Sequence, residues 1–232
     1  MKVLFSVIIL TKDRNKFLKK AINSIQFQKK KPIEILILDN SLSMSAKSLC
    51  LEKKYPKSIK YFSLTKINNV AKLRNFLAKK AKGNYLAFLD DDDYWDQNYL
   101  RDSSRIIKKN NAELLITNIN GLKNKKKIKL THFKKANPLN IKDFLIVNPG
   151  TLCSNIIINK SVFFKLGGYD SKVSGSCDKD LIIRVLENNI SYEINNMYLV
   201  NYTIHTNQWS SNPTKVIIQK LLFYQKYLSK YS

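Results

Sequence analysis

Short apolar runs alternate with amphipathic stretches along the first half of the chain. Four runs have the length and apolar character of strands: residues 3–10, 33–38, 59–64 and 85–89. Three stretches between them carry apolar side chains at helical spacing: residues 13–28, 45–55 and 69–82. Because strands that alternate with helices in this way pair side by side, the pattern predicts a mostly parallel, doubly wound α/β sheet.

The pattern changes after residue 117. A helix to about residue 110 and a strand at 113–117 continue the alternation, but residues 118–129 are rich in Asn, Gly and Lys, which is typical of a solvated hairpin. Later predictions are a helix at 141–147, a strand at 151–158, a helix at 159–166, a polar loop at 167–176 and a helix from 177. Neither a repeat nor a linker is visible. We therefore expect one domain over residues 1–212, with halves 1–117 and 118–212, and then an amphipathic helix at 213–232.

The composition favours anionic partners. The 232 residues carry 41 Lys and Arg against 17 Asp and Glu, a formal net charge of +24, which suits nucleotides, nucleic acid, phospholipid headgroups or phosphorylated lipid carriers. Cys50, Cys153 and Cys177 form no CxxC pair, which argues against a zinc ribbon or a disulfide scaffold and for the reducing cytoplasm. No cleavage site follows residues 1–10, so we interpret them as the first strand and not as a signal segment.

The strand at residues 85–89 ends in four consecutive aspartates, Asp90 to Asp93. Capping of the following helix accounts for one of them, and solvation of the others is the alternative to a function. Four like charges in a basic chain are better explained by a cation, and Mg²⁺ is usually held by one or two carboxylates with water and substrate phosphate. Thr11 and Asp39 also follow predicted strands. All these side chains would then lie at the carboxyl edge of the sheet, where open α/β sheets bind ligands.

Five segments, in matching order, resemble the inverting glycosyltransferases of family 2, which have the GT-A fold. They are residues 5–14 (FSVIILTKDR), 35–41 (ILILDNS), 73–75 (LRN), 83–93 (GNYLAFLDDDD) and 167–184 (GGYD, then DKDL and Arg184). The resemblance extends to about Ser211 and implies a Rossmann-like, mostly parallel central sheet flanked by helices, with a C-terminal acceptor-side subregion. On this basis residues 1–117 form the nucleotide-sugar-binding half, and residues 118–212 form the acceptor and catalytic-base half.

The resemblance also implies roles on the donor side. Six residues are expected to bind the nucleotide-sugar: Thr11, Arg14, Asp39, Arg74, Asp90 and Asp91. Asp92 is expected to bind Mn²⁺ or Mg²⁺, which neutralises the leaving diphosphate, and His205 is a second candidate metal ligand. The alternatives are a turn-capping role for Asp39, solvated arginines at positions 14 and 74, and a packed or surface position for His205.

On the acceptor side, a base must take the proton of the incoming hydroxyl. The resemblance assigns this role to Asp178. The family usually has glutamate just before the base, where this chain has Cys177, so Asp180 is the substitute candidate. The alternative is that Asp178 and Asp180 only cap the helix and complement its dipole.

These residues together predict a metal-dependent, inverting glycosyltransferase of the hexosyltransferase type. We expect it to move a sugar from a nucleotide-diphosphate sugar, first of all a UDP-sugar, to a hydroxyl of a glycan or lipid-linked acceptor in bacterial surface polysaccharide biosynthesis (lipopolysaccharide or capsule). One alternative is a sugar nucleotidyltransferase, but residues 11–14 lack the glycines of its phosphate loop. Another is a basic nucleic-acid-binding protein, but the lysines are spread over every element and no binding motif appears.

The segment 213–232 has a second distinctive pattern. Its apolar and aromatic residues recur on one helical stripe, with lysines scattered among them: Ile217, Leu221, Tyr224, Leu228 and Tyr231, and Lys215, Lys220, Lys226 and Lys230. Such a helix docks on its own domain, on a partner subunit or on an anionic membrane surface. The sequence alone slightly favours protein, whereas a lipid-linked acceptor would favour a peripheral contact with the inner face of the cell membrane.

Overall fold

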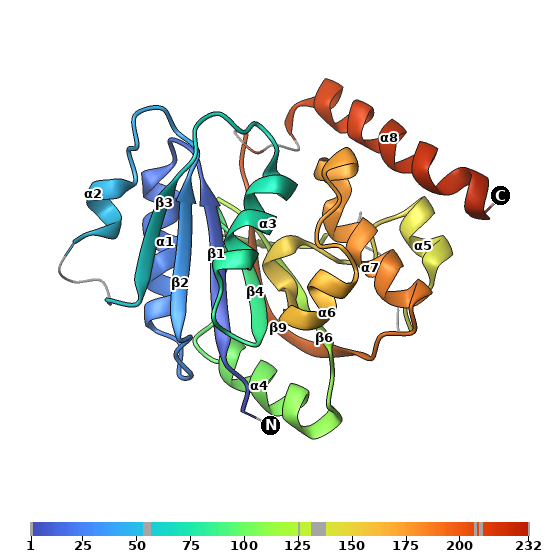
Figure 1. Ribbon diagram of the computed structural model, residues 1–232, viewed down its shortest axis with the longest axis horizontal. Coiled ribbons are helices and arrows are strands. Elements are labelled where there is room, and N and C mark those ends of the chain that lie inside the picture. Colours follow the sequence, from blue (N-terminus) through green and yellow to red (C-terminus); the bar gives the residue numbers. More distant parts are fainter. Residues whose placement is uncertain are drawn as a thin grey trace.

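The described strands form one sheet, and helices cover both of its faces (Figure 1). The computed structural model describes residues 2–52, 57–124, 126–130, 138–206, 208 and 211–231. The strands are β1 (Phe5–Thr11), β2 (Glu34–Asp39), β3 (Ile59–Ser63), β4 (Tyr85–Asp90), β5 (Tyr94–Trp95), β6 (Leu114–Lys123), β7 (Lys126–Ile128), β8 (Ile156–Asn159) and β9 (Tyr192–Ile204). The helices are α1 (Asn15–Gln26), α2 (Lys47–Cys50), α3 (Val70–Lys80), α4 (Tyr99–Asn110), α5 (Ile141–Ile146), α6 (Lys160–Lys165), α7 (Cys177–Glu187) and α8 (Pro213–Tyr231), with 3₁₀ helices η1 (Cys153–Asn155) and η2 (Ser171–Ser176).

The order of strands in the sheet is β3-β2-β1-β4-β8-β6-β9-β5, and β7 pairs with β6. Strands β3, β2, β1 and β4 are parallel neighbours, as their alternation with helices predicts. The other half of the sheet is mixed, because β8 pairs antiparallel with both β4 and β6 while β6 and β9 are parallel. The α/β prediction is confirmed. The register pairs Leu10 with Asp90, so the carboxyl ends of β1 and β4 meet at one edge.

Burial on both faces explains why the central strands are mostly apolar, with their few polar residues at or near the strand ends. In β1, Val7 and Ile9 pack in the layer that contains α1 and α4, whereas Ile8 packs in the layer that contains α3, α6 and α7. The same alternation occurs in β2, where Ile35 and Leu36 belong to opposite layers. A strand that is covered on both sides has no face left for polar residues.

Gly83 lets β4 enter the sheet close against β1. A Cβ atom at this position would lie 2.6 Å from both the Leu4 carbonyl oxygen and the Ser6 nitrogen. The Gly83 N–H donates instead to Ser6 Oγ at 2.8 Å. This close approach of two backbones requires glycine, and it sets the acidic end of β4 beside the turn that follows β1.

Several elements differ from the predictions. The stretch predicted as a strand at 151–158 is first the 3₁₀ helix η1 and only then β8, and the 13-residue strand β9 was not predicted. The helix predicted at 45–55 is the short α2, with residues 53–56 outside the described residues. The polar loop at 167–176 contains η2. Within the described ranges, no helix combines the length and the apolar character that crossing a membrane requires.

Candidate active site

A cavity of about 370 Å³ lies at the carboxyl ends of β1 and β4, and it is also lined by residues of α3, η1, η2, α7, β9 and the neighbouring loops. Six side chains predicted from the sequence line it: Arg14, Arg74, Asp90, Asp91, Asp92 and Asp178. The acidic cluster and the candidate base are far apart in the sequence, yet they face one space. Its volume is within the range of small-molecule sites.

Asp93 is buried and, unlike the three aspartates before it, does not line the cavity. Its carboxylate accepts hydrogen bonds from Ser154 Oγ at 2.6 Å and from the Thr203 N–H at 2.9 Å. Burial raises the pKa of Asp93 well above its usual range, with the charges of Asp92 and Asp90 acting in the same direction. Asp93 therefore ties the turn after β4 to η1 and β9, which is a structural role.

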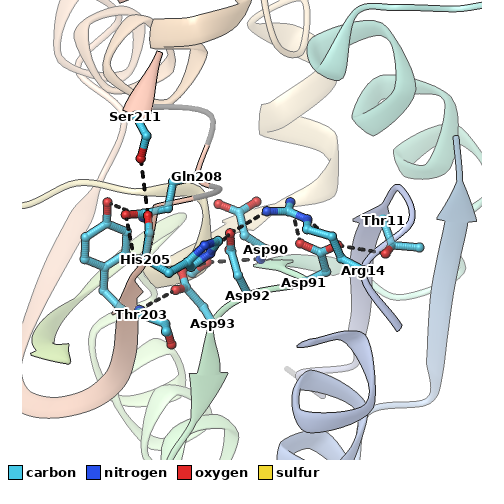
Figure 2. Close-up of polar contacts among 12 residues, drawn as sticks. Thr11, Arg14, Asp90, Asp91, Asp92, Asp93, Thr203, His205, Gln208 and Ser211 are labelled. Atoms are coloured by element: carbon cyan, nitrogen blue, oxygen red, sulfur yellow. Dashed lines mark hydrogen bonds and ion pairs between the residues drawn. The ribbon is translucent and has the colours of Figure 1, made fainter. Parts of the chain in front are cut away.

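Arg14 bridges two aspartates at the edge of the cavity (Figure 2). Its guanidinium lies 2.6 Å from Asp91 Oδ1 and 2.8 Å from Asp92 Oδ2, while Thr11 Oγ1 donates to Asp91 Oδ2 at 2.7 Å. Burial raises the pKa of Asp91 to about 7, against the Arg14 charge, which lowers it. Burial lowers the pKa of Arg14, but the neighbouring carboxylates raise it above its ordinary value. Arg14 is thus a cation held inside the acidic cluster and not a solvated arginine.

His205 contacts Asp92 from the side opposite to Arg14 (Figure 2). Its Nε2 atom is 3.1 Å from Asp92 Oδ2, and its ring stacks on Phe17 with 4.6 Å between the centroids. The backbone N–H of His205 donates to Gln208 Oε1 at 3.1 Å. These contacts fix the imidazole beside the aspartate that is the candidate metal ligand.

Arg74 joins the acidic cluster to the start of α7. One guanidinium nitrogen, Nη2, lies 2.5 Å from Asp90 Oδ1, and Nη1 donates to Cys177 Sγ at 3.6 Å. The Arg74 side chain is only 12% exposed, whereas that of Asp90 is 36% exposed. A solvated position for Arg74 is therefore ruled out, and Asp90 is the more accessible member of the pair.

Asp178 lies in the first turn of α7 and lines the cavity. Its Oδ1 atom accepts a hydrogen bond from the Lys179 N–H at 2.8 Å. Burial raises the pKa of Asp178, while the Lys179 and Arg74 charges act to lower it. A carboxylate with a raised pKa, mounted at the rigid start of a helix, suits a general base.

Asp39 has the contacts of a turn cap. The side chain is fully buried and is not part of the cavity lining. Oδ1 accepts from the N–H and the hydroxyl of Ser41, and Oδ2 accepts from the Ala46 N–H at 3.0 Å and from the Tyr61 hydroxyl at 3.1 Å. The alternative of a capping aspartate therefore describes this structure, and a role for Asp39 in nucleotide binding stays a prediction.

Asp180 faces the opposite side of α7 from the cavity. Arg184 donates to its Oδ2 through Nε at 2.9 Å and Nη2 at 2.6 Å, while the Tyr227 hydroxyl, at 2.6 Å, and Lys226 Nζ contact Oδ1. The side chain is fully buried and does not line the cavity. The substitute role of Asp180 as base is contradicted, because both of its oxygens are engaged away from the site.

The cavity residues fit a hard divalent cation. The Asp92 carboxylate and the His205 imidazole converge, and Asp90 opens on the same space. The part of the chain that the structure describes holds no ready group of three or more His, Cys, Asp or Glu ligands. A cation that is completed by water and a substrate diphosphate does not need such a group. A cation bound to Asp92 would compete with Arg14, because Arg14 and His205 both contact the Oδ2 atom of Asp92.

Sequence reasoning missed several residues that shape the site. Ser154 and Thr203 hold Asp93, Phe17 supports His205, and Lys179 lines the cavity beside Asp178. The first three contact partners that are distant along the chain. Each residue meets its partner only in the folded protein, so no local sequence pattern could have predicted these contacts.

Comparisons with known proteins agree on one family. The family model described as "Glycosyl transferase family 2" matches residues 6–167. The chain is 26% identical over 137 residues to the poly(ribitol-phosphate) β-N-acetylglucosaminyltransferase TarS of Staphylococcus aureus, a match that covers 58% of this chain and 24% of TarS. It is 29% identical over 214 residues to an uncharacterized glycosyltransferase of Methanocaldococcus jannaschii, covering 88% of this chain and 71% of that protein.

Solved structures agree with this family match. The crystal structure of S. aureus TarS residues 1–349 in complex with UDP-GlcNAc superposes with a TM-score of 0.72 at 19% sequence identity, over 94% of this chain and 65% of that one. The likeness shows a shared fold, which is the predicted GT-A fold. The match to full-length TarS spans about a quarter of that protein.

Proposed function

The chain belongs to glycosyl transferase family 2, and from this premise we propose that its cavity transfers a sugar from a UDP-sugar to a hydroxyl group of a glycan or lipid-linked acceptor, with inversion at the sugar carbon. One observation carries the proposal: Asp92, the candidate ligand of a diphosphate-bound cation, and Asp178, the candidate base, line the same cavity. Inverting transfer needs these two functions on opposite sides of one sugar carbon.

The relatives support the choice of donor and acceptor class. TarS structures contain UDP-GlcNAc and UDP, and TarS and TarP are both named as poly(ribitol-phosphate) β-N-acetylglucosaminyltransferases. UDP-GlcNAc is therefore the first donor to test, and a surface polysaccharide is the first acceptor class. The net charge of +24 is compatible with an acceptor that carries phosphate.

On the donor side, the acidic cluster and two arginines would handle the diphosphate. Asp92, with Asp90 and His205 nearby, would hold Mn²⁺ or Mg²⁺, which supplies positive charge to the diphosphate as it leaves. Arg14 and Arg74 present planar donor groups at the same cavity, and such groups suit phosphate oxygens. Thr11 orients Asp91, which in turn positions Arg14.

On the acceptor side, Asp178 would accept the hydroxyl proton as the new glycosidic bond forms. Its raised pKa brings its basicity closer to that required near neutral pH. Lys179 and Arg74 keep positive charge close to the carboxylate and favour its ionised form. The η2 residues Ser174 to Ser176 line the same side of the cavity, so they are placed to contact an acceptor.

Calorimetric titration with UDP and UDP-GlcNAc, with and without Mn²⁺, tests this proposal. We expect UDP to bind more tightly with Mn²⁺, and we expect Asp92→Ala to remove the metal-dependent part of the affinity. Asp143→Ala, on α5 and outside the cavity lining, is the matched control and should bind like the wild type. Absence of UDP and UDP-sugar binding in the wild type, under both conditions, would overturn the proposal.

A further inference from the structure

Helix α8 has apolar side chains on two opposite faces. On its inner face, Phe223 and Tyr227 are buried in the core, where they pack with residues of α7 and η2. On its outer face, five large aliphatic side chains are between 38% and 63% exposed: Ile217, Ile218, Leu221, Leu222 and Leu228. We call these five residues the outer face of α8. A helix that is apolar on both sides is normally covered on both sides.

The outer face is continuous along the helix and is bordered by lysines. At 100° per residue, its five side chains fall within an arc of about 140°, with Gln225 as a polar interruption. Lys215 and Lys220 lie on either side of this arc and are exposed. Lys226 and Lys230 are instead paired with carboxylates of the same chain, Asp170 and Glu187, at 2.7 Å each. Helix α8 contains no Asp or Glu.

Charge decides which kind of partner fits this face. A second copy of the chain would bring another net charge of +24 and the same lysines to the interface, so the two copies would repel each other. An anionic phospholipid membrane matches both features of the outer face. Its acyl layer would cover the apolar side chains, and its negatively charged headgroups would attract the bordering lysines. We propose that the outer face of α8 docks on an anionic phospholipid membrane.

The inner face of the same helix contacts the wall of the candidate active site. The Gly175 N–H donates to Gln219 Oε1 of α8 at 2.9 Å, and Lys179 Nζ lies 4.2 Å from the centre of the Phe223 ring. Gly175 and Lys179 both line the cavity, on the side of Asp178. In Figure 1, α8 runs along the outside of the molecule next to α7 and η2, on the side away from α2.

Docking through α8 would therefore place the acceptor side of the cavity near the lipid surface. This placement suits an acceptor that is itself anchored by a lipid, so the proposal deepens the proposed function and rests on it for the identity of the acceptor. The contact with the membrane depends only on the outer face. It can be measured without donor or acceptor.

Sedimentation of the full chain with vesicles tests the proposal. The vesicles contain phosphatidylglycerol and phosphatidylcholine, or phosphatidylcholine alone, and binding is measured at low salt and at roughly 0.5 M salt, which screens surface charges. The variant is Ile217→Ser with Leu221→Ser. The matched control is Leu51→Ser, which is 67% exposed beyond the end of α2.

We expect the wild type and the Leu51→Ser control to bind the anionic vesicles and to keep part of this binding at high salt. The α8 variant should bind about tenfold more weakly and should be released at high salt, because only lysine attraction remains. Wild type that does not bind anionic vesicles, or a variant that binds as well as the wild type at both salt concentrations, would overturn the proposal. A dimer in light scattering that the variant abolishes would overturn it as well, in favour of a second copy.

Two further measurements distinguish a loss of vesicle binding from misfolding of a variant and from failure of the proposed function. Circular dichroism melting checks the fold of each variant, and Leu228→Ser with Lys220→Glu tests the same face if the first variant does not fold. Calorimetric titration with UDP should give the wild-type affinity for all α8 variants, because the outer face lies outside the cavity lining. Loss of vesicle binding with intact UDP binding supports the docking proposal, whereas absence of UDP binding in the wild type contradicts only the proposed function.

Discussion

Asp178 and Asp180 lie two residues apart on α7, yet the fold gives their carboxylates different surroundings. Asp178 lines the cavity, and burial raises its pKa. Asp180 contacts Arg184, Lys226 and Tyr227 on the other side of the helix. A base must have an oxygen within reach of the acceptor hydroxyl. Its position, and not the residue type, is therefore the reason why we propose Asp178 and not Asp180 as the base.

The pH dependence of turnover tests this assignment. A base acts only when it is ionised, and the pKa of Asp178 is raised above its ordinary value of 3.8, so kcat/KM should fall as the pH drops through the raised pKa. We expect Asp178→Asn to lower kcat by about 10²-fold or more and to remove this acidic limb. The measurement is the pH–rate profile of the wild type and of the variant. A kcat of Asp178→Asn within about tenfold of the wild-type value at every pH would show that another group is the base.

At the residue scale, the sequence predicted which side chains gather at the site better than it predicted what each one contacts. Position after a strand indicated Arg14 and Asp92, and the family resemblance indicated Asp178. The structure brings all three side chains to one cavity. For Asp39 the same signals allowed both a ligand and a cap. Its capping partners include Tyr61 on the neighbouring strand, a contact that depends on how the sheet is assembled.

Among the elements, the pairing of β4 with β1 depends on Gly83. We expect Gly83→Ala to lower the free energy of unfolding by about 1–3 kcal/mol, because its Cβ would lie 2.6 Å from backbone atoms of Leu4 and Ser6, which cannot move aside without disturbing the strand. Denaturant unfolding followed by circular dichroism measures this change. An unfolding midpoint equal to that of the wild type would show that the two backbones do not pack this closely.

The contact between α7 and α8 depends on Asp180. We expect Asp180→Ala to lower the free energy of unfolding by about 3 kcal/mol, because Arg184 and Lys226 lose a buried partner. Asp170→Ala is the control, since its carboxylate is partly exposed and, within the described ranges, its one salt bridge is to Lys226. Its loss should cost about 1 kcal/mol, including its cap on η2. The measurement is thermal or denaturant unfolding of both variants. An equal decrease in the free energy of unfolding for Asp180→Ala and Asp170→Ala would contradict a special role for Asp180.

The buried central strands and the amphipathic helices that cover them were the most predictable elements. The strands β1, β2 and β4 and the helices α1 and α3 have strong apolar patterns, which identify them without tertiary information. Strand β9 was missed because its residues alternate only weakly, and its pairing with β6 shifts register near Asn118. The segment at η1 was predicted as a strand because a short buried segment has no sequence periodicity that distinguishes a 3₁₀ helix from a strand.

At the scale of the whole molecule, net charge and sequence motifs differ in how much they indicate about function. The net charge of +24 favoured anionic partners without choosing among them. The five sequence segments in matching order indicated the family that the family model confirms. The match covers about a quarter of TarS, so the acceptor of TarS can be taken over only as a proposal. The proposed acceptor side of the cavity is formed by η2 and α7, and no sequence pattern encodes the shape of this wall.

Release of UDP from UDP-GlcNAc in the presence of Mn²⁺, with water in place of the acceptor hydroxyl taking up the sugar, tests the central claim most directly. This reaction requires the donor site and the base in one cavity. We expect turnover by the wild type and by the Asp143→Asn control, and a loss of about 10²-fold or more in both Asp92→Asn and Asp178→Asn. Turnover by both cavity variants at the wild-type rate would contradict the claim that these two carboxylates carry out the transfer.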